Sequence, residues 1–481
     1  MSSSLSRQLF SPALRLALLV AGAAPMAQAQ RVARPDAAKS SGVAVWLTTA
    51  DKAVLFQPQA GQLKLGAGTN AHPTIEIDEA RTYQTIDGFG YCLTGGSARL
   101  LHQMAPAERA GLLRELFGTD GRSIGVSYLR VSIGASDLDD RVFSYDDLPA
   151  GQTDPALAHF SLAPDQPHLL PVLKEILTIN PSIKILGSPW SPPTWMKTNG
   201  ESKGGSLKPD FYDAYARYFV KYIEGMRAAG VRIDAITVQN EPLHPGNNPS
   251  LLMPAEQQAA FIGQSLGPAF RQAKLDTKII CYDHTADKPE YPLTVLNDAT
   301  AAPYVDGSAF HLYAGPIEAL SQVHDAHPEK NVYFTEQWVG AKSKFDENLR
   351  WHTKILIIGA TRNWARTVLE WNLAADPQQN PHTPGGCTEC LGAVTLAGNT
   401  VTRNEAYYII AHASKFVRPG SVRIASTLPE KLPNVAFRTP TGQRVLVVLN
   451  DGTDAQAFNI RQGGRQVAAT LPAGAVGTYV W

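Results

Sequence analysis

The sequence is short of the features that mark several classes of protein. Four cysteines in 481 residues are too few for a disulfide-based scaffold. The 43 basic and 43 acidic side chains cancel, so no net charge favours binding to nucleic acid or to an anionic membrane. There is no internal repeat and no run of like charge. A neutral or polar substrate therefore fits the composition, and the length suits one large domain with a smaller companion.

The first thirty residues resemble a targeting segment. Residues 13–26 are mostly apolar, Arg7 and Arg15 are basic, and the tripeptide Ala-Gln-Ala at 27–29 has the small residues of a cleavage site. We interpret residues 1–29 as a signal peptide and expect a secreted or periplasmic protein. A membrane anchor is the alternative, but Arg15 breaks an apolar stretch that is already shorter than the roughly 20 residues a bilayer requires. We expect no integral membrane segment in the mature chain.

Strand-like and helical segments alternate through residues 83–415. Eight apolar runs have the length and composition of strands, and helical patterns separate them. These runs are 86–90, 126–133, 183–189, 233–240, 278–283, 305–313, 331–337 and 366–373. Eight alternations predict an α/β fold, a (β/α)8 TIM barrel, whose chemistry is expected at the carboxyl ends of the strands.

Residues 416–481 change to short strands separated by Gly, Pro, Asn and Asp. This pattern predicts an all-β sandwich domain attached to the barrel. Residues 42–82 also alternate as strands do, and we expect them to join the same domain.

Two glutamates stand at the ends of predicted strands. Glu241 follows Asn240 and precedes Pro242, and Glu336 ends the run at 331–337. Hydrolysis of a glycosidic bond requires two such carboxyl groups, one to donate a proton and one to act as nucleophile or base. We assign Glu241 as acid/base and Glu336 as nucleophile. A solvated surface turn is the alternative for Glu241 alone, but the second glutamate on a matching strand end favours catalysis.

Aromatic and histidine side chains lie near other strand ends. Trp190 and Trp195 stand among prolines after the third predicted strand, where their rings suit stacking on a sugar. Burial in the core is the alternative, and it is as reasonable as sugar contact for Trp195. His311 and Tyr313 end another strand and are either site residues or a hydrogen-bonded core pair.

Other chemistries leave weaker traces. Cys387 and Cys390 form the one close cysteine pair, and a local disulfide is favoured over half of a zinc site because no second ligand pair has zinc spacing. Gly-x-Ser-x-Gly occurs around Ser123 and Ser265, but neither lies between a strand and a helix as an esterase nucleophile would. We therefore expect no metal and no cofactor.

At these residues the sequence resembles glycoside hydrolase family 30, the family of glucosylceramidase, from about Gln84 to Trp481. The matching stretches are Asp87-Gly-Phe-Gly90, Arg130-Val-x-x-x-Ala-Ser-Asp137, Ser188-Pro-Trp190-x-x-Pro-Thr-Trp195-x-Lys-Thr-Asn-Gly200, Asn240-Glu241-Pro242, Glu336-x-x-Val-Gly340 and Trp371-Asn-Leu-Ala374. The resemblance implies a retaining double displacement with the two glutamates in the roles assigned above. It further implies glycone-pocket and supporting residues. Asp137, Trp190, Asn240 and Trp371 would line the pocket, and Arg130, His311 and Tyr313 would support the carboxylates.

Two stretches depart from glucosylceramidase, residues 381–390 and 93–97. Both look more like microbial members that cut β-1,6-linked glucan, so the resemblance leaves a carbohydrate and a glycolipid open as the substrate. Xylan- and fucoside-cleaving members of the family are further alternatives. A catalytically silent carbohydrate-binding protein is the alternative from another class, although both glutamates are present. The oligomeric state is left open by the sequence.

Overall fold

A computed structural model describes residues 42–481 of the chain. The predicted signal peptide at residues 1–29 lies outside the described residues. Among those that are described, no helix is both long and apolar enough to cross a membrane.

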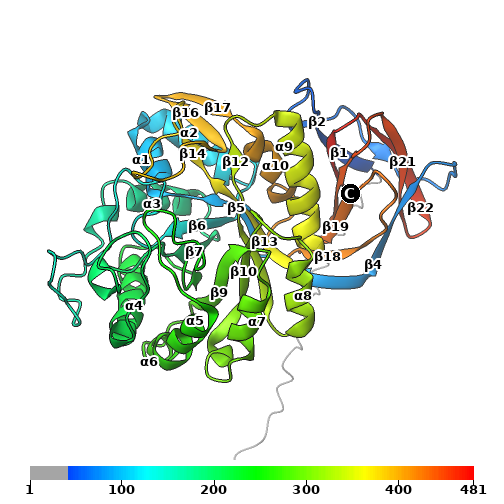
Figure 1. The fold of residues 1–481 in the computed structure, drawn as a ribbon. Helices are drawn as coiled ribbons and strands as arrows, with labels where there is room; N and C mark the ends of the chain where they lie inside the picture. The colour runs from blue at the N-terminus through cyan, green and yellow to red at the C-terminus, as the bar shows by residue number, and fades with distance from the viewer. Residues whose placement is uncertain (1–41) are drawn as a thin grey trace, which may run out of the picture. The chain divides into compact units, whose positions relative to one another are not determined.

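Eight parallel strands close into a barrel (Figure 1). Each lies within two or three residues of its predicted position except β8, which is shorter than the predicted run at 233–240. The strands are β5 (Gly88–Cys92), β6 (Tyr128–Ser132), β7 (Lys184–Ser188), β8 (Ala235–Thr237), β9 (Lys278–Thr285), β10 (Val305–His311), β11 (Asn331–Glu336) and β13 (Ala365–Asn372). The backbone leaves strand geometry before Glu241, so that residue lies in a loop after β8.

Helices follow the barrel strands and surround them (Figure 1). In α4, apolar and aromatic side chains recur at helical spacing and are buried, which explains why this segment packs as a helix. The helices are α1 (Gly95–Gln103), α2 (Pro106–Phe117), α3 (Leu169–Ile179), α4 (Tyr212–Ala228), α5 (Ala255–Phe261), α6 (Gly267–Gln272), α7 (Glu290–Asn297), α8 (Ala319–Ala326), α9 (Phe345–His352) and α10 (Glu405–Ser414). Single π-helical segments, Ile262–Leu266 and Thr353–Ala360, join α5 to α6 and extend α9.

A layer of buried side chains fills the middle of the barrel. It consists of Tyr128, Leu186, Ala235, Ile280, Ala309, Tyr333 and Leu369. The barrel is therefore a packed core rather than a channel, and a ligand can enter only at an end.

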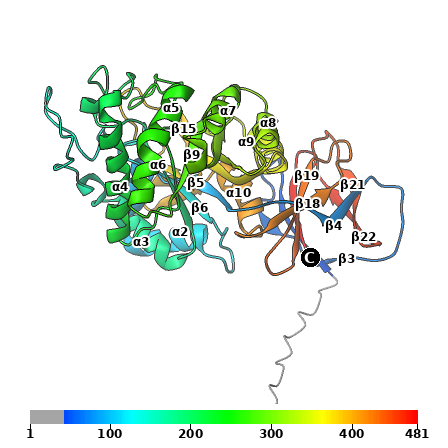
Figure 2. The same cartoon turned by 90° about the horizontal axis from the view of Figure 1, so that it is seen from below.

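A second, ten-stranded sheet is built from both ends of the described chain (Figure 2). Its order is β2-β1-β23-β20-β19-β18-β4-β21-β22, with β3 paired to β1. The strands are β1 (Gly42–Thr48), β2 (Gln57–Pro58), β3 (Leu63–Lys64), β4 (Thr74–Thr85), β18 (Val422–Ser426), β19 (Asn434–Arg438), β20 (Arg444–Leu449), β21 (Gln456–Gln462), β22 (Arg465–Leu471) and β23 (Val476–Val480). The predicted barrel with an attached all-β sandwich is confirmed.

Two small sheets form from loops after the barrel strands. In one, β12 (Val339–Gly340) pairs with β15 (Cys390–Leu391). In the other, β14 (Ala374–Ala375), β16 (Val394–Ala397) and β17 (Thr400–Arg403) associate. The β12–β15 pair brings a segment just after Glu336 beside the predicted cysteine pair.

Candidate active site

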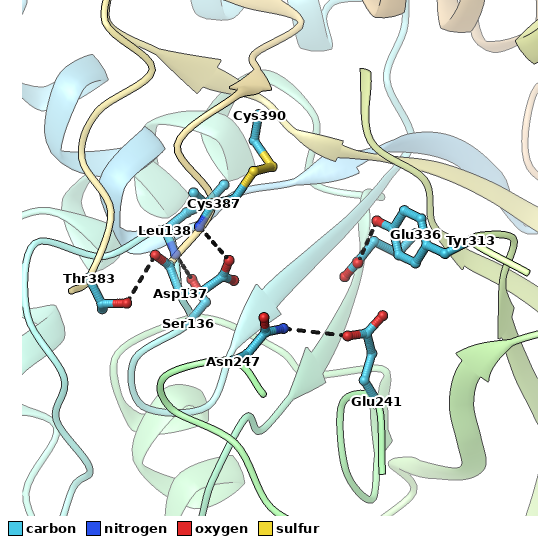
Figure 3. The surroundings of a disulfide bond; sticks show 10 residues. All are labelled: Ser136, Asp137, Leu138, Glu241, Asn247, Tyr313, Glu336, Thr383, Cys387 and Cys390. Carbon is cyan, nitrogen blue, oxygen red and sulfur yellow. Dashed lines mark hydrogen bonds between the residues drawn. A yellow bond between two sulfur atoms is a disulfide. The ribbon is translucent and has the colours of Figure 1, made fainter. Parts of the chain in front are cut away.

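A pocket of about 460 Å³ opens at the carboxyl ends of the barrel strands. The side chains around it come from loops far apart in the sequence. They are Asp137, Trp190, Asn240, Glu241, His244, Asn247, His284, Thr285, Tyr313, Glu336, Trp338, Trp371, Cys387 and Cys390. Figure 3 shows Asp137, Asn247, Glu241 and Glu336 around one space, with the cysteine pair at its edge.

Glu336 is the last residue of β11 and is buried. The guanidinium of Arg130 contacts its Oε2 through Nη1, and the hydroxyl of Tyr313 donates to its Oε1 at 2.8 Å. Both carboxylate oxygens are thus occupied by donors, which is the arrangement that an ionised carboxylate requires.

Glu241 is buried at the start of the loop after β8, with a φ of 44°. This left-handed backbone conformation is rare for a residue with a side chain, and it is concentrated at functional sites. The backbone is anchored because the Glu241 N–H donates to the carbonyl of Asp283 at 2.9 Å. The carboxylate has longer contacts, 3.4 Å to Asn247 Nδ2 and 3.3 Å to His311 Nδ1.

His311 joins the two glutamates. Its Nδ1 lies 3.3 Å from Glu241 Oε1 and 3.6 Å from Glu336 Oε1. A ring nitrogen of His311, a carboxylate oxygen of Glu241 and a carboxylate oxygen of Glu336 all lie within 4.8 Å of one another. The two carboxyl groups are therefore close enough to act on one bond.

A network of buried side chains beneath the pocket positions His311 and the two glutamates. Arg130 Nη2 donates to Asp283 Oδ2 and to Asn240 Oδ1, each at 2.7 Å. The other oxygen of Asp283, Oδ1, accepts from Thr335 at 2.7 Å and contacts His311 Nε2 at 3.0 Å. Asp283 thus orients both the guanidinium behind Glu336 and the imidazole between the glutamates.

Electrostatics in this network follow from its charges. Burial would raise the pKa of Asp283, but Arg130 and His311 bring it far below its usual value. Burial would lower the pKa of His311, yet the negative charges of Glu336 and Asp283 raise it to about 9. His311 is therefore positively charged at neutral pH, as is Arg130.

The two glutamates titrate as a pair. Burial raises the pKa of Glu336, and the charge of Glu241 adds to that rise. Burial acts in the same direction on Glu241, but hydrogen bonding and the charge of His311 lower its pKa overall. With Arg130 and His311 positive and Asp283 negative, one proton on the glutamate pair leaves the cluster neutral, which a buried site favours.

Asp137 lies in the loop after β6, and its Oδ2 accepts from the N–H of Cys387 at 3.2 Å (Figure 3). Burial and the charge of Glu336 raise the pKa of Asp137 to about 7. A carboxyl group with this pKa is suited to exchange hydrogen bonds with sugar hydroxyls in either protonation state.

The two predicted pocket tryptophans stack on one another. The rings of Trp190 and Trp371 lie 5.4 Å apart at 30°, and the guanidinium of Arg130 lies 4.8 Å from the centre of the Trp190 ring. Trp195 does not line the pocket. It is buried, packs edge-on against Phe211 and donates its indole N–H to the carbonyl of Asp146, so the core alternative holds for it.

Comparison with known proteins places this site in a family. Residues 86–417 match the glycosyl hydrolase family 30 TIM-barrel domain, and residues 420–479 match the glycosyl hydrolase family 30 beta sandwich domain. The chain belongs to glycoside hydrolase family 30. The predicted resemblance to this family is confirmed, and the chain is a glycosidase.

Individual family 30 relatives match along most of their length. The endo-1,6-beta-D-glucanase neg1 of Aspergillus fumigatus is 34% identical over 451 residues, which cover 88% of this chain and 90% of the relative. The lysosomal acid glucosylceramidase of Mus musculus is 30% identical and covers 85% and 83%. The solved structure of an endo-beta1,6-glucanase has a TM-score of 0.86 at 36% identity and covers 92% of this chain and 99% of its own.

All nine site residues predicted for this family 30 chain lie in the pocket or in the network beneath it. Seven line the pocket, and the other two, Arg130 and His311, are buried behind the carboxylates and contact them. Sequence reasoning missed Asp283, which ends a predicted strand just as Glu336 does. Its strand-end position was the available signal. His284, the next residue of β9, was also missed, as were Asn247 and Trp338, whose loops carry no comparable pattern.

Two groups of described side chains have the donors that a metal ion would use. One is Glu241, His311 and Glu336, and the other is Asp146, Asp154 and His159. In the first group, a cation would compete with the guanidinium of Arg130 and the Tyr313 hydroxyl for Glu336. Both oxygens of Glu336 therefore already have donors, Arg130 and Tyr313, which a metal ion would have to displace.

Proposed function

We propose that this family 30 glycosidase cleaves β-D-glucosidic bonds with retention of configuration, and that β-1,6-linked glucan is its substrate. Glu336 acts as nucleophile, and Glu241 acts as general acid and then as general base. Asp137, Trp190, Asn240 and Trp371 bind the sugar.

The observation that supports this proposal is the spacing of the two glutamates. Oxygens of Glu241 and Glu336 lie within 4.8 Å of one another. Retaining enzymes hold their carboxyl groups about 5 to 5.5 Å apart, whereas inverting enzymes need about 6.5 to 9.5 Å to admit a water molecule. The spacing favours direct attack by a carboxylate.

The reaction then has two steps. The Glu336 carboxylate attacks the anomeric carbon while Glu241 protonates the departing glycosidic oxygen, which leaves a glycosyl ester on Glu336. Glu241, now ionised, removes a proton from water as the water attacks the same carbon and releases Glu336.

Hydrogen bonding supports this division of roles. Arg130 can only donate, and it occupies one oxygen of Glu336 while Tyr313 occupies the other. Burial raises the pKa of Glu336 and His311 lowers that of Glu241, which by itself would put the shared proton on Glu336. We give more weight to the hydrogen bonds, because a proton on Glu336 would compete with the two donors that already occupy its oxygens. Glu241 has only the longer contacts with Asn247 and His311, so the shared proton is better accommodated there once a glycosidic oxygen lies beside it.

The surroundings of the pocket favour a polysaccharide over a lipid. Among described residues, the exposed large hydrophobic side chains are Tyr313, Trp351 and Leu428, and of these only Tyr313 lines the pocket. A ceramide would need an apolar surface beside the pocket, whereas a glucan needs rings and hydrogen-bonding groups. The Aspergillus fumigatus relative and the solved neighbour are both named as β-1,6-glucanases.

The test is product analysis on β-1,6-glucan and on glucosylceramide side by side, with Glu336→Gln as control. Gluco-oligosaccharides from the glucan, absent with the variant, would support the proposal, and NMR of the first product would report retention. Ceramide release alone would make glucosylceramide the substrate. Activity on neither would contradict the proposed substrate, and early release of the inverted anomer would contradict the mechanism.

We also infer that the enzyme is exported, as the expected signal peptide at residues 1–29 and the polymeric substrate both require. Amino-terminal sequencing of protein recovered outside the cytoplasm tests this inference. A mature chain beginning near Gln30 is expected, and an uncleaved cytoplasmic chain would contradict it.

A further inference from the structure

Residues 381–391, here called the bridging loop, contact the loop that carries Asp137. Thr383 donates its N–H to the Asp137 carbonyl at 2.9 Å. Cys387 donates its N–H to the Asp137 carboxylate at 3.2 Å (Figure 3). Gly386 makes this approach possible, because a Cβ there would lie 2.3 Å from the Asp137 carbonyl oxygen. The bridging loop thus holds both the backbone and the side chain of Asp137.

The same loop contacts the segment beside Glu241. The Thr383 hydroxyl donates to the carbonyl of Asn248 at 2.5 Å, and Asn248 Nδ2 donates to the carbonyl of Pro384 at 3.1 Å. The residue before Asn248 is Asn247, whose side chain contacts Glu241.

A third set of contacts reaches the segment after Glu336. Cys390 and Leu391 of β15 pair with Gly340 and Val339 of β12, and the Ala341 N–H donates to the carbonyl of Glu389 at 2.8 Å. The bridging loop therefore touches all three segments that carry pocket carboxylates.

A disulfide between Cys387 and Cys390 joins the two halves of this loop. Cys387 belongs to the half that faces Asp137, and Cys390 belongs to the half that pairs with β12. Both cysteines also line the pocket and pack in a cluster with Trp190, Trp371 and Trp338. The disulfide thus covalently links the residue that donates to Asp137 with the strand that pairs with β12, just after Glu336. It also forms part of the pocket wall.

We propose that the Cys387–Cys390 disulfide is a positioning element of the active site, which holds the Asp137 carboxylate in place for sugar binding. The proposal rests on the proposed function. Reduction by a dithiol would convert the bridge to two thiols with two electrons and two protons, and the reductant would become a disulfide. Loss of the bridge frees Cys387 to move away from Asp137, so sugar binding weakens while the two glutamates remain in place.

The test is a double-mutant cycle with gluco-oligosaccharides from β-1,6-glucan as substrate. Cys387→Ser/Cys390→Ser removes the bridge and keeps the backbone donor, and Asp137→Asn removes the carboxylate that this donor holds. Because the serine pair no longer holds the Cys387 N–H against Asp137, we expect it to lower kcat/KM about ten-fold, mainly through KM, which corresponds to about 1.4 kcal/mol. In the Asp137→Asn background the same change should cost less than about two-fold, because the two effects are coupled.

A reductant supplies the matched control. Dithiothreitol should reproduce the KM increase in the parent enzyme and have no effect on the serine pair, which has no bridge to reduce. Equal losses in both backgrounds would overturn the proposal, since the bridge would then act independently of Asp137. A lowered melting temperature with unchanged KM would overturn it as well and leave the bridge a stabilising staple.

A crystal structure of the serine pair gives a readout that does not depend on activity. In that structure we expect the backbone N–H of residue 387 to have moved away from the Asp137 carboxylate. An unchanged contact would overturn the proposal. The parent enzyme and Glu336→Gln, assayed on the same oligosaccharides, test the proposed function separately. If the parent is inactive, the proposed substrate fails, and the crystal structure still decides the positioning role.

Discussion

The two ends of the barrel use charged residues in opposite ways. At the amino ends of the strands, Asp87 contacts both Lys184 and Arg366, and Lys278 contacts Asp306. The cations there are between one-fifth and two-fifths exposed. At the carboxyl ends, the carboxyl groups of Glu241, Asp283 and Glu336 converge on Arg130 and His311, and all five of these side chains are buried.

The charged residues of the amino end therefore stabilise the barrel, whereas those of the carboxyl end are arranged for acid and base chemistry. At the amino ends Asp87 and Asp306 each contact a cation, so their charges are balanced and their pKa values are lowered. At the carboxyl ends the acids outnumber the cations, so at least one must keep a proton near neutral pH. A site that retains an exchangeable proton can perform acid and base catalysis, whereas a neutralised pair can only hold the strands together.

Glu336→Gln should have the largest effect. Loss of the nucleophile is expected to lower kcat by at least about a thousand-fold, because the covalent step cannot occur. Steady-state kinetics on an aryl β-glucoside measure this, with Asp87→Asn from the opposite end as the comparison. Near-normal turnover by Glu336→Gln would remove the distinction between the two ends.

Glu241→Ala should have the next largest effect, a fall of about 10²- to 10⁴-fold on substrates with poor leaving groups. An activated leaving group needs no acid, so the first step should survive and the glycosyl ester should accumulate. Added azide should then restore turnover and give a β-glycosyl azide, detectable by mass spectrometry. No response to azide would contradict the acid/base assignment.

His311→Asn should displace the pH profile of kcat/KM. The charge of His311 lowers the pKa of Glu241 and opposes the rise in the pKa of Glu336. Both values should therefore increase in the variant, which moves the acidic and the basic limb to higher pH and costs most activity at low pH. A profile that loses height without moving would show that His311 only orients the carboxylates.

Asp87→Asn should have the smallest effect on activity and change stability instead. Burial raises the pKa of Asp87, but Arg366 and Lys184 outweigh it, so the folded-state pKa is lowered. Its contribution is thus present above the ordinary pKa of Asp and is lost as pH falls through the folded value. We expect a loss of about 1–3 kcal/mol at pH 7 that shrinks in acid, measured by urea unfolding, with kcat retained. A fall in kcat without a loss of stability would contradict this interpretation of the amino end.

Sequence patterns predicted the elements better than the details of their ends. The run at 233–240 is apolar enough to be predicted as one strand, but pairing with β7 and β9 stops at Thr237 and the chain turns to place Glu241. Trp190 and Trp195 stand in the same proline-rich stretch, yet one lines the pocket and the other is in the core. Local sequence cannot separate them, because the difference depends on which loop packs against each ring.

The sequence by itself determined the order of strands and helices, the presence of a second β domain and the two glutamates at matching strand ends. Hydrophobic periodicity and strand-end position are local properties, so they can be read along the chain. Only the tertiary structure decided that Asp283 links Arg130 to His311 and that Cys387 reaches Asp137, 250 residues away in the sequence. Such contacts arise when the barrel closes and loops from distant strands meet at one end, and no local pattern encodes which of them will touch.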